Sequence, residues 1–343
     1  MKNSTIHTQL STIKRTFVFA LAAACAAGAA ASSTNSPAAF RCFPPEIRTV
    51  GVVMPASILA KDRFFRGVAA LTNAGIRVKL ASRLSFDKVA SPSDRAADFA
   101  DMWMDPEVDL VLCARGGTGS EKILPLLDWN RLRTRDQRVL GFSNITMLLN
   151  AMLKERAGHP FSGPSISQML YASGDTFDWL RSAVAEGPLP PAKLRPLRAG
   201  AFSGLPCGGH IALVKLGIST GWACDAAGRV VFLERNNSAS AKAIGRELDA
   251  IAESSWLKDC AGVIFGDVTP GRGRECKGRR ALSAEELVAA RAEVEGFKRK
   301  FAERIGRPVY DGYQYGHIAV SHAIDFRRKV AVSENGTMTW EGK

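Results

Sequence analysis

The sequence lacks the residue patterns of several common protein classes. Its 343 residues include only five histidines, no H-E-x-x-H and no Cys/His cluster with zinc spacing, which argues against a zinc hydrolase. Helix-turn-helix spacing and interleaved aromatic and basic residues are missing too, so we expect no nucleic-acid partner. The longest apolar run is short of the ~20 residues that a membrane-spanning helix needs. What remains is an ordinary globular composition, 46% hydrophobic and 23% charged.

The amino-terminal residues 1–31 have the layout of a secretory signal peptide. Basic residues precede an alanine-rich apolar run at 16–31, and no acidic residue comes before it. Ala29 and Ala31 then offer an A-x-A cleavage site. We therefore expect a cleaved, periplasmic protein without stable membrane insertion. The alternatives are a cytoplasmic protein and a chain lipidated at Cys25.

The chain is basic, with a formal net charge of +13 that falls by three, to +10, without residues 1–31. Much of the excess lies in the segment 271–280, GRGRECKGRR, which reads as a solvated loop. Such a charge attracts acidic partners, including cell-wall polymers. The seven cysteines form no small-domain disulfide framework, and Cys113 lies inside an apolar strand pattern, which predicts a buried thiol.

Short apolar runs alternate with helical periodicity in the first half of the chain. Strands and helices are predicted in turn over 47–54, 61–72, 76–80, 93–104 and 108–114. Such alternation is typical of βαβ units and a mostly parallel sheet, in which ligands bind beyond the carboxyl ends of the strands.

A weaker pattern separates this half from a second periodic region. The stretch 166–204 contains the glycine- and proline-rich residues Gly187 to Pro191, and we interpret it as a linker. We predict the α/β fold class, with an amino-terminal domain over 46–165 and a carboxy-terminal domain over 205–343. Near the end of the latter, Asn335-Gly336 between apolar runs predicts a β-hairpin.

The stretch 139–153, VLGFSNITMLLNAML, carries the strongest chemical signal. An apolar run ends at Phe142, Ser143 follows, and a helical apolar face begins at Ile145. A serine at a sharp strand-to-helix turn is the geometry of a nucleophile elbow, although the second glycine of G-x-S-x-G is missing here. The alternative is that Ser143 simply caps the helix.

A glycine-rich loop, Arg115 to Gly119, follows the apolar run 108–114. As a dinucleotide-binding loop it is weak, because the third glycine of G-x-G-x-x-G is absent. As a tight turn that brings bare backbone close to a substrate, it suits the conformational freedom of glycine. A loop that merely needs positive φ angles is the simpler alternative.

Taken in order, these segments resemble the LD-carboxypeptidases (muramoyltetrapeptide carboxypeptidases) and their relatives, the microcin C immunity peptidases. The resemblance runs from about Val50 to the carboxyl end. It rests on VGVVMPAS, VDLVLCARGGTGSEKILPLLDW, VLGFSNITMLL, SGLPCGGHIALVKLG, VVFLE and YGHIAVSHAIDF. It implies a flavodoxin-like amino-terminal domain that carries the serine and a smaller mixed α/β carboxy-terminal domain.

The resemblance also implies the roles of individual residues. Ser143 would be the nucleophile, His317 the general base and Glu234 the carboxylate that orients the base. Backbone N–H groups would form the oxyanion hole, from Asn144, Gly116 and Gly117. The implied reaction removes the terminal D-alanine from a murein tetrapeptide without metal or cofactor.

Several positions depart from the family pattern. Asn144 stands where Asp is common in the family. Ser162 replaces the histidine of the usual His-Gly-Pro, and His210 replaces the asparagine of the usual Gly-Gly-Asn. The segment 271–300 looks like an insertion. Two alternatives therefore stay open. One is a peptidase or amidase of the microcin-immunity type acting on another peptide conjugate, and the other is a non-catalytic murein-binding homologue. We expect a homodimer in either case.

The predicted export leads to a direct test. The mature protein should begin near Ser32, because cleavage is expected after Ala31. Amino-terminal sequencing of the protein from a periplasmic fraction would check this. An intact Met1 in a cytosolic fraction would contradict it.

Overall fold

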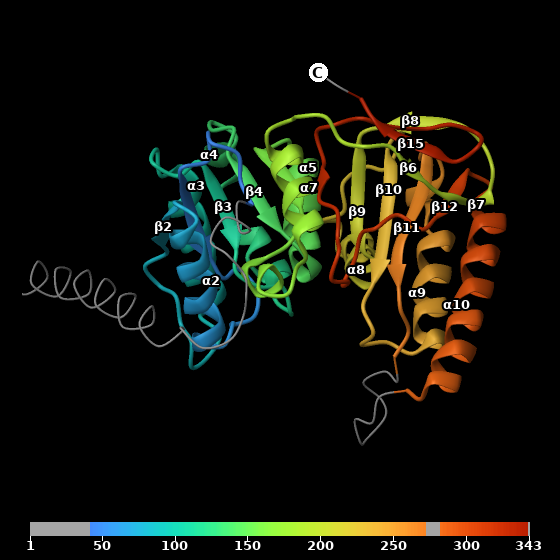
Figure 1. Cartoon of the computed structure of the whole chain (residues 1–343), viewed down its shortest axis with the longest axis horizontal. Coiled ribbons are helices and arrows are strands. Elements are labelled where there is room, and N and C mark those ends of the chain that lie inside the picture. Colours follow the sequence, from blue (N-terminus) through green and yellow to red (C-terminus); the bar gives the residue numbers. More distant parts are fainter. Residues whose placement is uncertain (1–41, 272–281, 342–343) are drawn as a thin grey trace, which may run out of the picture.

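The computed structural model describes residues 42–271 and 282–341. The predicted signal peptide 1–31, Cys25 and all but Gly271 of the basic segment 271–280 lie outside the described residues. Two α/β units lie side by side, with α5 and α7 between the two larger sheets (Figure 1). Within the described ranges, no helix has the length and apolar character to cross a membrane.

The secondary structure alternates between strands and helices along most of the chain. The α-helices are α2 (Lys61–Asn73), α3 (Pro92–Met104), α4 (Trp129–Leu132), α5 (Thr146–Lys154), α6 (Ile166–Met169), α7 (Gly174–Val184), α8 (Ile211–Thr220), α9 (Ala241–Glu253) and α10 (Ala284–Ile305). The strands are β1 (Thr49–Val53), β2 (Arg77–Leu80), β3 (Leu110–Cys113), β4 (Arg138–Gly141), β5 (His159–Ser162), β6 (Ala192–Lys193), β7 (Arg195–Arg198), β8 (Phe202–Gly204), β9 (Pro206–His210), β10 (Val230–Arg235), β11 (Gly262–Val268), β12 (Val309–Asp311), β13 (Ile324–Asp325), β14 (Val330–Val332) and β15 (Thr337–Trp340).

One predicted helix begins earlier than its sequence suggested. The sequence predicts Ser93 as the cap of a helix through Met104, but α3 begins at Pro92, and Ser91 caps it by accepting the Asp94 N–H at 3.1 Å. Proline suits the first helical position because its missing N–H would have no partner there.

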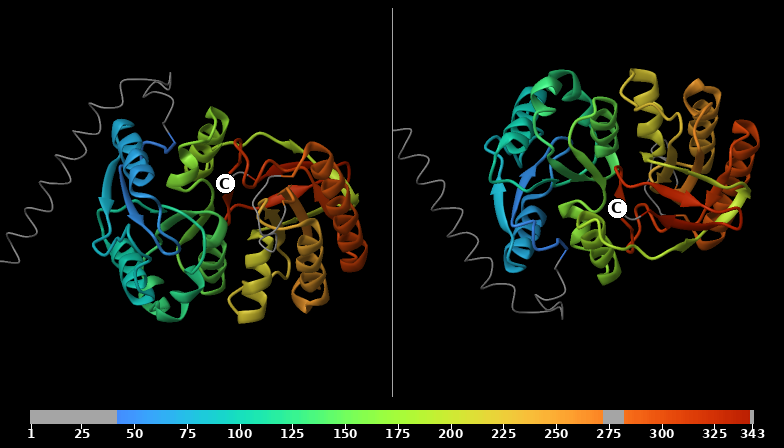
Figure 2. Two further views of the ribbon diagram at one scale, coloured as in Figure 1. Left: turned by 90° about the horizontal axis from the view of Figure 1, so that it is seen from below. Right: turned by 90° about the horizontal axis from the view of Figure 1, so that it is seen from above.

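The first sheet has the strand order β13-β5-β4-β3-β1-β2. Its five strands from β5 to β2 are parallel, which is the flavodoxin-like order 2-1-3-4-5. Helices cover both faces of this sheet (Figure 2). All of β1 and β3 is buried, as expected for strands of a doubly covered parallel sheet. The predicted α/β class with a flavodoxin-like unit is confirmed.

The second sheet has the order β7-β12-β11-β10-β9, parallel except for its β7 edge. Figure 2 shows α8, α9 and α10 in a row along one face. The alternation of side chains along β10 divides the core: Val231 and Leu233 pack with these helices. Val230 and Phe232 face the opposite way and join the core of the first unit. The two units therefore share apolar packing.

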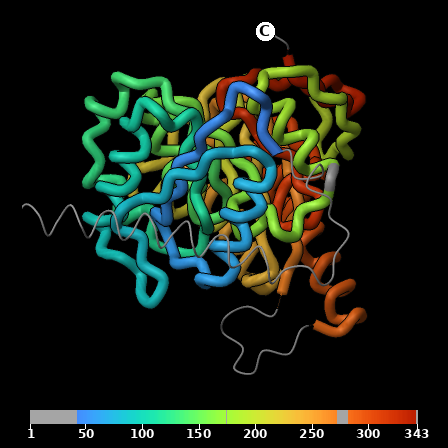
Figure 3. The backbone as a smooth tube through the Cα atoms, turned by 60° about the vertical axis from the view of Figure 1, so that its left-hand side comes forward, coloured from blue at the N-terminus to red at the C-terminus, as the bar shows by residue number. Residues whose placement is uncertain are grey.

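The carboxyl end of the chain contacts both units. Strand β13 pairs antiparallel with β5 at the edge of the first sheet, where His159 Nε2 and Asp325 Oδ1 are 2.6 Å apart. The hairpin β14–β15, predicted from Asn335-Gly336, joins β8 and β6 in a small third sheet. These strands lie together at the top of Figure 3. The predicted linker 166–204 thus contains α6, α7 and three strands.

A polar seam joins the helix after Ser143 to the second sheet. Buried Asn150, on α5, donates to the Gly208 carbonyl at 2.8 Å and accepts the Gly208 N–H at 3.2 Å. Thr146 Oγ1 accepts the His210 N–H at 3.2 Å. The main-chain groups of β9 in these bonds belong to Gly208 and His210, which are among its last three residues. The seam therefore fixes the end of β9 against the start of α5.

This seam predicts a stability effect. Asn150→Ala should lower the free energy of unfolding by about 1–3 kcal/mol, because both main-chain groups of Gly208 lose their buried partner. Denaturant titration would measure it. The matched control is Asn73→Ala at the exposed end of α2, where we expect a change within about 0.5 kcal/mol. Equal, small effects of the two substitutions would contradict a structural role for the seam.

Candidate active site

Ser143 occupies a strained turn at the carboxyl end of β4. Its φ angle is +61°, in the left-handed region that residues other than glycine rarely adopt. The preceding Phe142 is extended, and a 3₁₀ turn over Ser143–Ile145 leads into α5. The N-cap positions of this turn and of α5 are Phe142 and Ile145, so Ser143 does not stand at the cap position that the helix-cap alternative requires. The turn has the form of an elbow that presents the hydroxyl.

The glycine-rich loop packs directly on this elbow. A Cβ atom on Gly116 would lie 2.7 Å from the Ser143 Cβ, so only glycine fits there. Gly117 has a φ angle of +102°. The Asn144 side chain accepts the Ser120 N–H at 2.9 Å, and the Ser120 hydroxyl donates to the Asn144 carbonyl at 2.7 Å. The loop and the elbow are therefore held together as one rigid surface.

Glu234 and His317 form a hydrogen-bonded pair. His317 Nδ1 lies 2.8 Å from Glu234 Oε2, although 83 residues separate them in the sequence. The Glu234 side chain is fully buried, whereas 24% of the His317 side chain is exposed. Because a carboxylate only accepts, Nδ1 carries a proton, and in the neutral imidazole the lone pair is then on Nε2. The Phe142 ring, next to Ser143, has its centroid 4.7 Å from that of His317.

The elbow, the loop and the Glu234–His317 pair thus meet where the two sheets adjoin. Sequence reasoning named these residues but could not bring them together. No hydrogen bond joins Ser143 to His317 within residues 42–271 and 282–341. The arrangement offers a hydroxyl, an imidazole with a free lone pair, and the main chain of a glycine loop around one point, which are the components of acyl transfer.

A further histidine, His210, lies at the same point. The centroids of its ring and the His317 ring are 5.8 Å apart. His210 is buried, and burial lowers the pKa of its imidazole to about 4. In the sequence alone, His210 stands out only as a departure from the family pattern. The signal available was its position directly after Gly208-Gly209 at the end of a strand.

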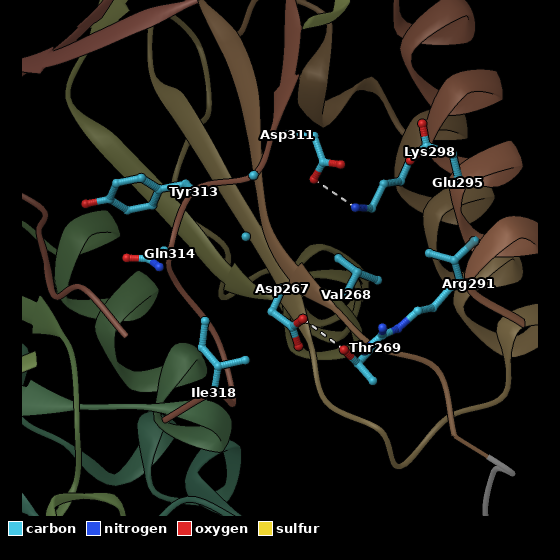
Figure 4. Close-up of a pocket in the computed structure, with 13 residues that line it drawn as sticks. Asp267, Val268, Thr269, Arg291, Glu295, Lys298, Asp311, Tyr313, Gln314 and Ile318 are labelled. Carbon is cyan, nitrogen blue, oxygen red and sulfur yellow. Dashed lines mark hydrogen bonds and ion pairs between the residues drawn. The ribbon is translucent and has the colours of Figure 1, made fainter. Parts of the chain in front are cut away.

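A cavity of about 390 Å³ lies beyond the carboxyl ends of β11 and β12. Figure 4 shows Asp267, Gln314 and Ile318 on one side of it and Arg291, from α10, on the other. Asp267 accepts a hydrogen bond from the Thr269 hydroxyl at 2.8 Å, and burial raises the pKa of its carboxyl. Ile318 follows His317, so the cavity borders the candidate site.

Metal-ligating and redox groups are sparse in the described chain. No group of three or more His, Cys, Asp or Glu residues within the described ranges could hold a metal ion. The five described cysteines are free and buried, which confirms the prediction for Cys113.

Comparison with known proteins identifies the family. The sequence profile described as LD-carboxypeptidase N-terminal domain matches residues 50–163, and the one described as LD-carboxypeptidase C-terminal domain matches residues 203–332. The chain belongs to the LD-carboxypeptidase family. It is therefore a serine-type hydrolase, and the two matched segments correspond to the two α/β units.

Individual relatives agree with this assignment. The chain is 24% identical over 325 residues to the murein tetrapeptide carboxypeptidase of Pseudomonas aeruginosa, covering 90% of this chain and all of that one. It is 26% identical over 301 residues to the "Probable murein peptide carboxypeptidase" of Bacillus subtilis, covering 83% and 88%. Among solved structures, an MccF-like protein from Bacillus anthracis superposes with a TM-score of 0.72 at 18% identity, covering 86% and 97%.

The fit of the glycine loop on the elbow can be tested. Gly116→Ala should reduce hydrolytic turnover by about 100-fold, because the added methyl group must displace Ser143 or the loop. Steady-state kinetics would measure the loss. Gly296→Ala is the matched control, since no atom lies within 4 Å of the added Cβ and α10 tolerates alanine. Parental turnover in Gly116→Ala would contradict the close packing.

Proposed function

We propose that this LD-carboxypeptidase family member removes the terminal D-alanine from a murein tetrapeptide by a metal-free Ser143–His317–Glu234 mechanism. The observation that carries the proposal is the 2.8 Å contact between His317 Nδ1 and the buried Glu234 carboxylate, beside the strained Ser143 turn. Family membership and the names of the murein-acting relatives support the substrate class.

In the first half of the reaction, Ser143 Oγ attacks the carbonyl carbon before the terminal D-alanine, and its proton passes to His317 Nε2. The buried Glu234 carboxylate stabilises the resulting imidazolium and keeps the Nδ1 tautomer. The carbonyl oxygen becomes an oxyanion. Backbone N–H groups are proposed to stabilise it, from Asn144, Gly116 and Gly117.

In the second half, the intermediate collapses and His317 donates its proton to the leaving amine of D-alanine. A water molecule then attacks the acyl-Ser143 ester and gives its proton to His317. Collapse of this second intermediate returns the proton to Ser143 Oγ and releases the shortened peptide. Each proton taken by the imidazole is thereby given back, and no redox change occurs.

Substitution of the three residues tests this mechanism. Ser143→Ala should lower turnover of the murein tetrapeptide by about 10⁴-fold or more. It should change the unfolding free energy by less than about 0.5 kcal/mol, because Ser143 is not the N-cap residue of the turn or of α5. Glu234→Gln should slow the reaction by up to about 10⁴-fold. Adding His317→Ala to Ser143→Ala should cost little more, since the members of a catalytic unit are not additive.

The matched control is Asp175→Asn, which removes the carboxylate partner of a different histidine, His322. Its turnover should stay near that of the parent, and a chelator should have no effect on any variant. Mass spectrometry of the products identifies the bond that is cut. Release of D-alanine by Ser143→Ala at the parental rate would rule the mechanism out.

The same experiment separates the alternative substrates. Loss of one D-alanine from the tetrapeptide alone supports the carboxypeptidase. Cleavage of an aminoacyl conjugate instead would favour a microcin-immunity type of peptidase, and binding without turnover would favour a murein-binding homologue. A periplasmic location is proposed on the signal-like layout of residues 1–31. The homodimer stays a prediction, which analytical ultracentrifugation would test.

A further inference from the structure

His210 lies between the two halves of the candidate site. It is the last residue of β9 and stands in register with Glu234 on the neighbouring parallel strand β10. Side chains in register on adjacent strands project from the same face of a sheet, so the His210 side chain accompanies Glu234 toward His317. The His210 main chain, meanwhile, donates to Thr146 at the start of α5.

The contacts of His210 determine which ring nitrogen carries its proton. Arg235 Nη1 lies 3.3 Å from His210 Nε2. A guanidinium group has donors and no acceptor, so Nε2 must be the unprotonated nitrogen. Glu247 holds Arg235 in place with contacts of 2.8 and 3.1 Å to its guanidinium. Because burial depresses its pKa to about 4, His210 is neutral at pH 7, and the remaining proton must be on Nδ1.

The Nδ1–H group of His210 has no partner. Nδ1 is buried and makes no hydrogen bond to any residue in the part of the chain that the structure describes. A buried donor without an acceptor is costly, and such groups in native proteins call for an explanation. The position beside His317 supplies one, namely an acceptor that arrives with the substrate.

We propose that His210 Nδ1–H donates a hydrogen bond to the free carboxylate at the end of the peptide and so selects substrates that have one. The proposal rests on the proposed function above. In that mechanism His317 protonates the leaving amine, and the carboxylate of the leaving residue is only two bonds from that nitrogen. A donor whose ring flanks the His317 ring is therefore placed to meet it. Arg235, donating to Nε2, polarises the imidazole and strengthens the donor at Nδ1.

A tautomer measurement tests the premise independently of activity. In the ¹⁵N spectrum of the full protein with labelled histidine, His210 should be neutral and protonated on Nδ1 at pH 7. The signals would be assigned by their loss in His210→Asn. Adding murein tetrapeptide to the Ser143→Ala protein should shift the Nδ1–H proton resonance, as a new hydrogen bond requires. An Nε2-protonated ring, or an imidazolium, would overturn the proposal whatever the enzyme's activity.

A pair of substrates tests the consequence. One is the murein tetrapeptide with its free terminal carboxylate, and the other is the same peptide ending in D-alaninamide. His210→Ala should lower kcat/KM for the acid by about 10- to 100-fold, the usual loss of a hydrogen bond to a charged group. For the amide, a weaker acceptor, the loss should be below about threefold. The parent's preference for the acid should therefore collapse.

Two conservative variants give a matched control. The side-chain nitrogen of asparagine occupies the position of Nδ1, whereas that of glutamine reaches toward Nε2. His210→Asn should keep most of the preference for the acid, and His210→Gln should lose it, at similar melting temperatures. Equal losses on both substrates, or rescue by glutamine instead of asparagine, would overturn the proposal. If Ser143→Ala were to cleave both peptides, the proposed function would fail, while the tautomer measurement would still decide the state of His210.

Discussion

The site depends on the seam between α5 and β9, because its components come from two different sheets. The first sheet and its loops supply Ser143 and the glycine-rich loop, and the second supplies Glu234 at the end of β10. Asn150 and Thr146 join α5 to the last residues of β9 through hydrogen bonds. These bonds fix which residue of α5 lies against which residue of β9, and apolar contacts could not do so. A shift of α5 by one residue along β9 would leave buried amide groups unpaired. The seam therefore sets the distance across the site more sharply than the shared apolar core does.

Two neighbouring residues at the end of β10 serve two different histidines. In a regular strand Glu234 and Arg235 would project from opposite faces. The pairing of β10 with β11 shifts register between Leu233 and Arg235, where β11 has one residue more than β10, so Arg235 lies at the irregular end of this pair of strands. Glu234 contacts His317 Nδ1, and Arg235 contacts His210 Nε2. The Glu234 carboxylate holds a proton on His317 Nδ1, so the neutral ring keeps a free lone pair at Nε2. The Arg235 guanidinium contacts the unprotonated Nε2 of His210, so that ring keeps a free N–H at Nδ1.

The sequence predicted more of the local structure than of the assembly. The apolar runs located β1, β3 and β4, and the turn at Ser143 could be recognised from its flanking periodicities, because both depend on neighbours along the chain. The pairing of β13 with β5 could not be foreseen, since two residues carry too little pattern to define a strand. Nor could the role of His210, because it depends on a contact with Arg235 and on the absence of one at Nδ1. Both are properties of the folded chain.

Three unfavourable features converge at the site. Ser143 holds a left-handed backbone, which costs about 1–3 kcal/mol in a residue other than glycine. Glu234 Oε1 and His210 Nδ1 are both buried without partners among the described residues, and they belong to side chains in register on adjacent strands. Together they surround one point between two sheets.

A protein that only bound murein would gain nothing from the strain at Ser143, which a glycine there would relieve at once. The retention of a strained serine beside an oriented imidazole is what turnover requires, so the geometry favours a working hydrolase over a binding-only homologue.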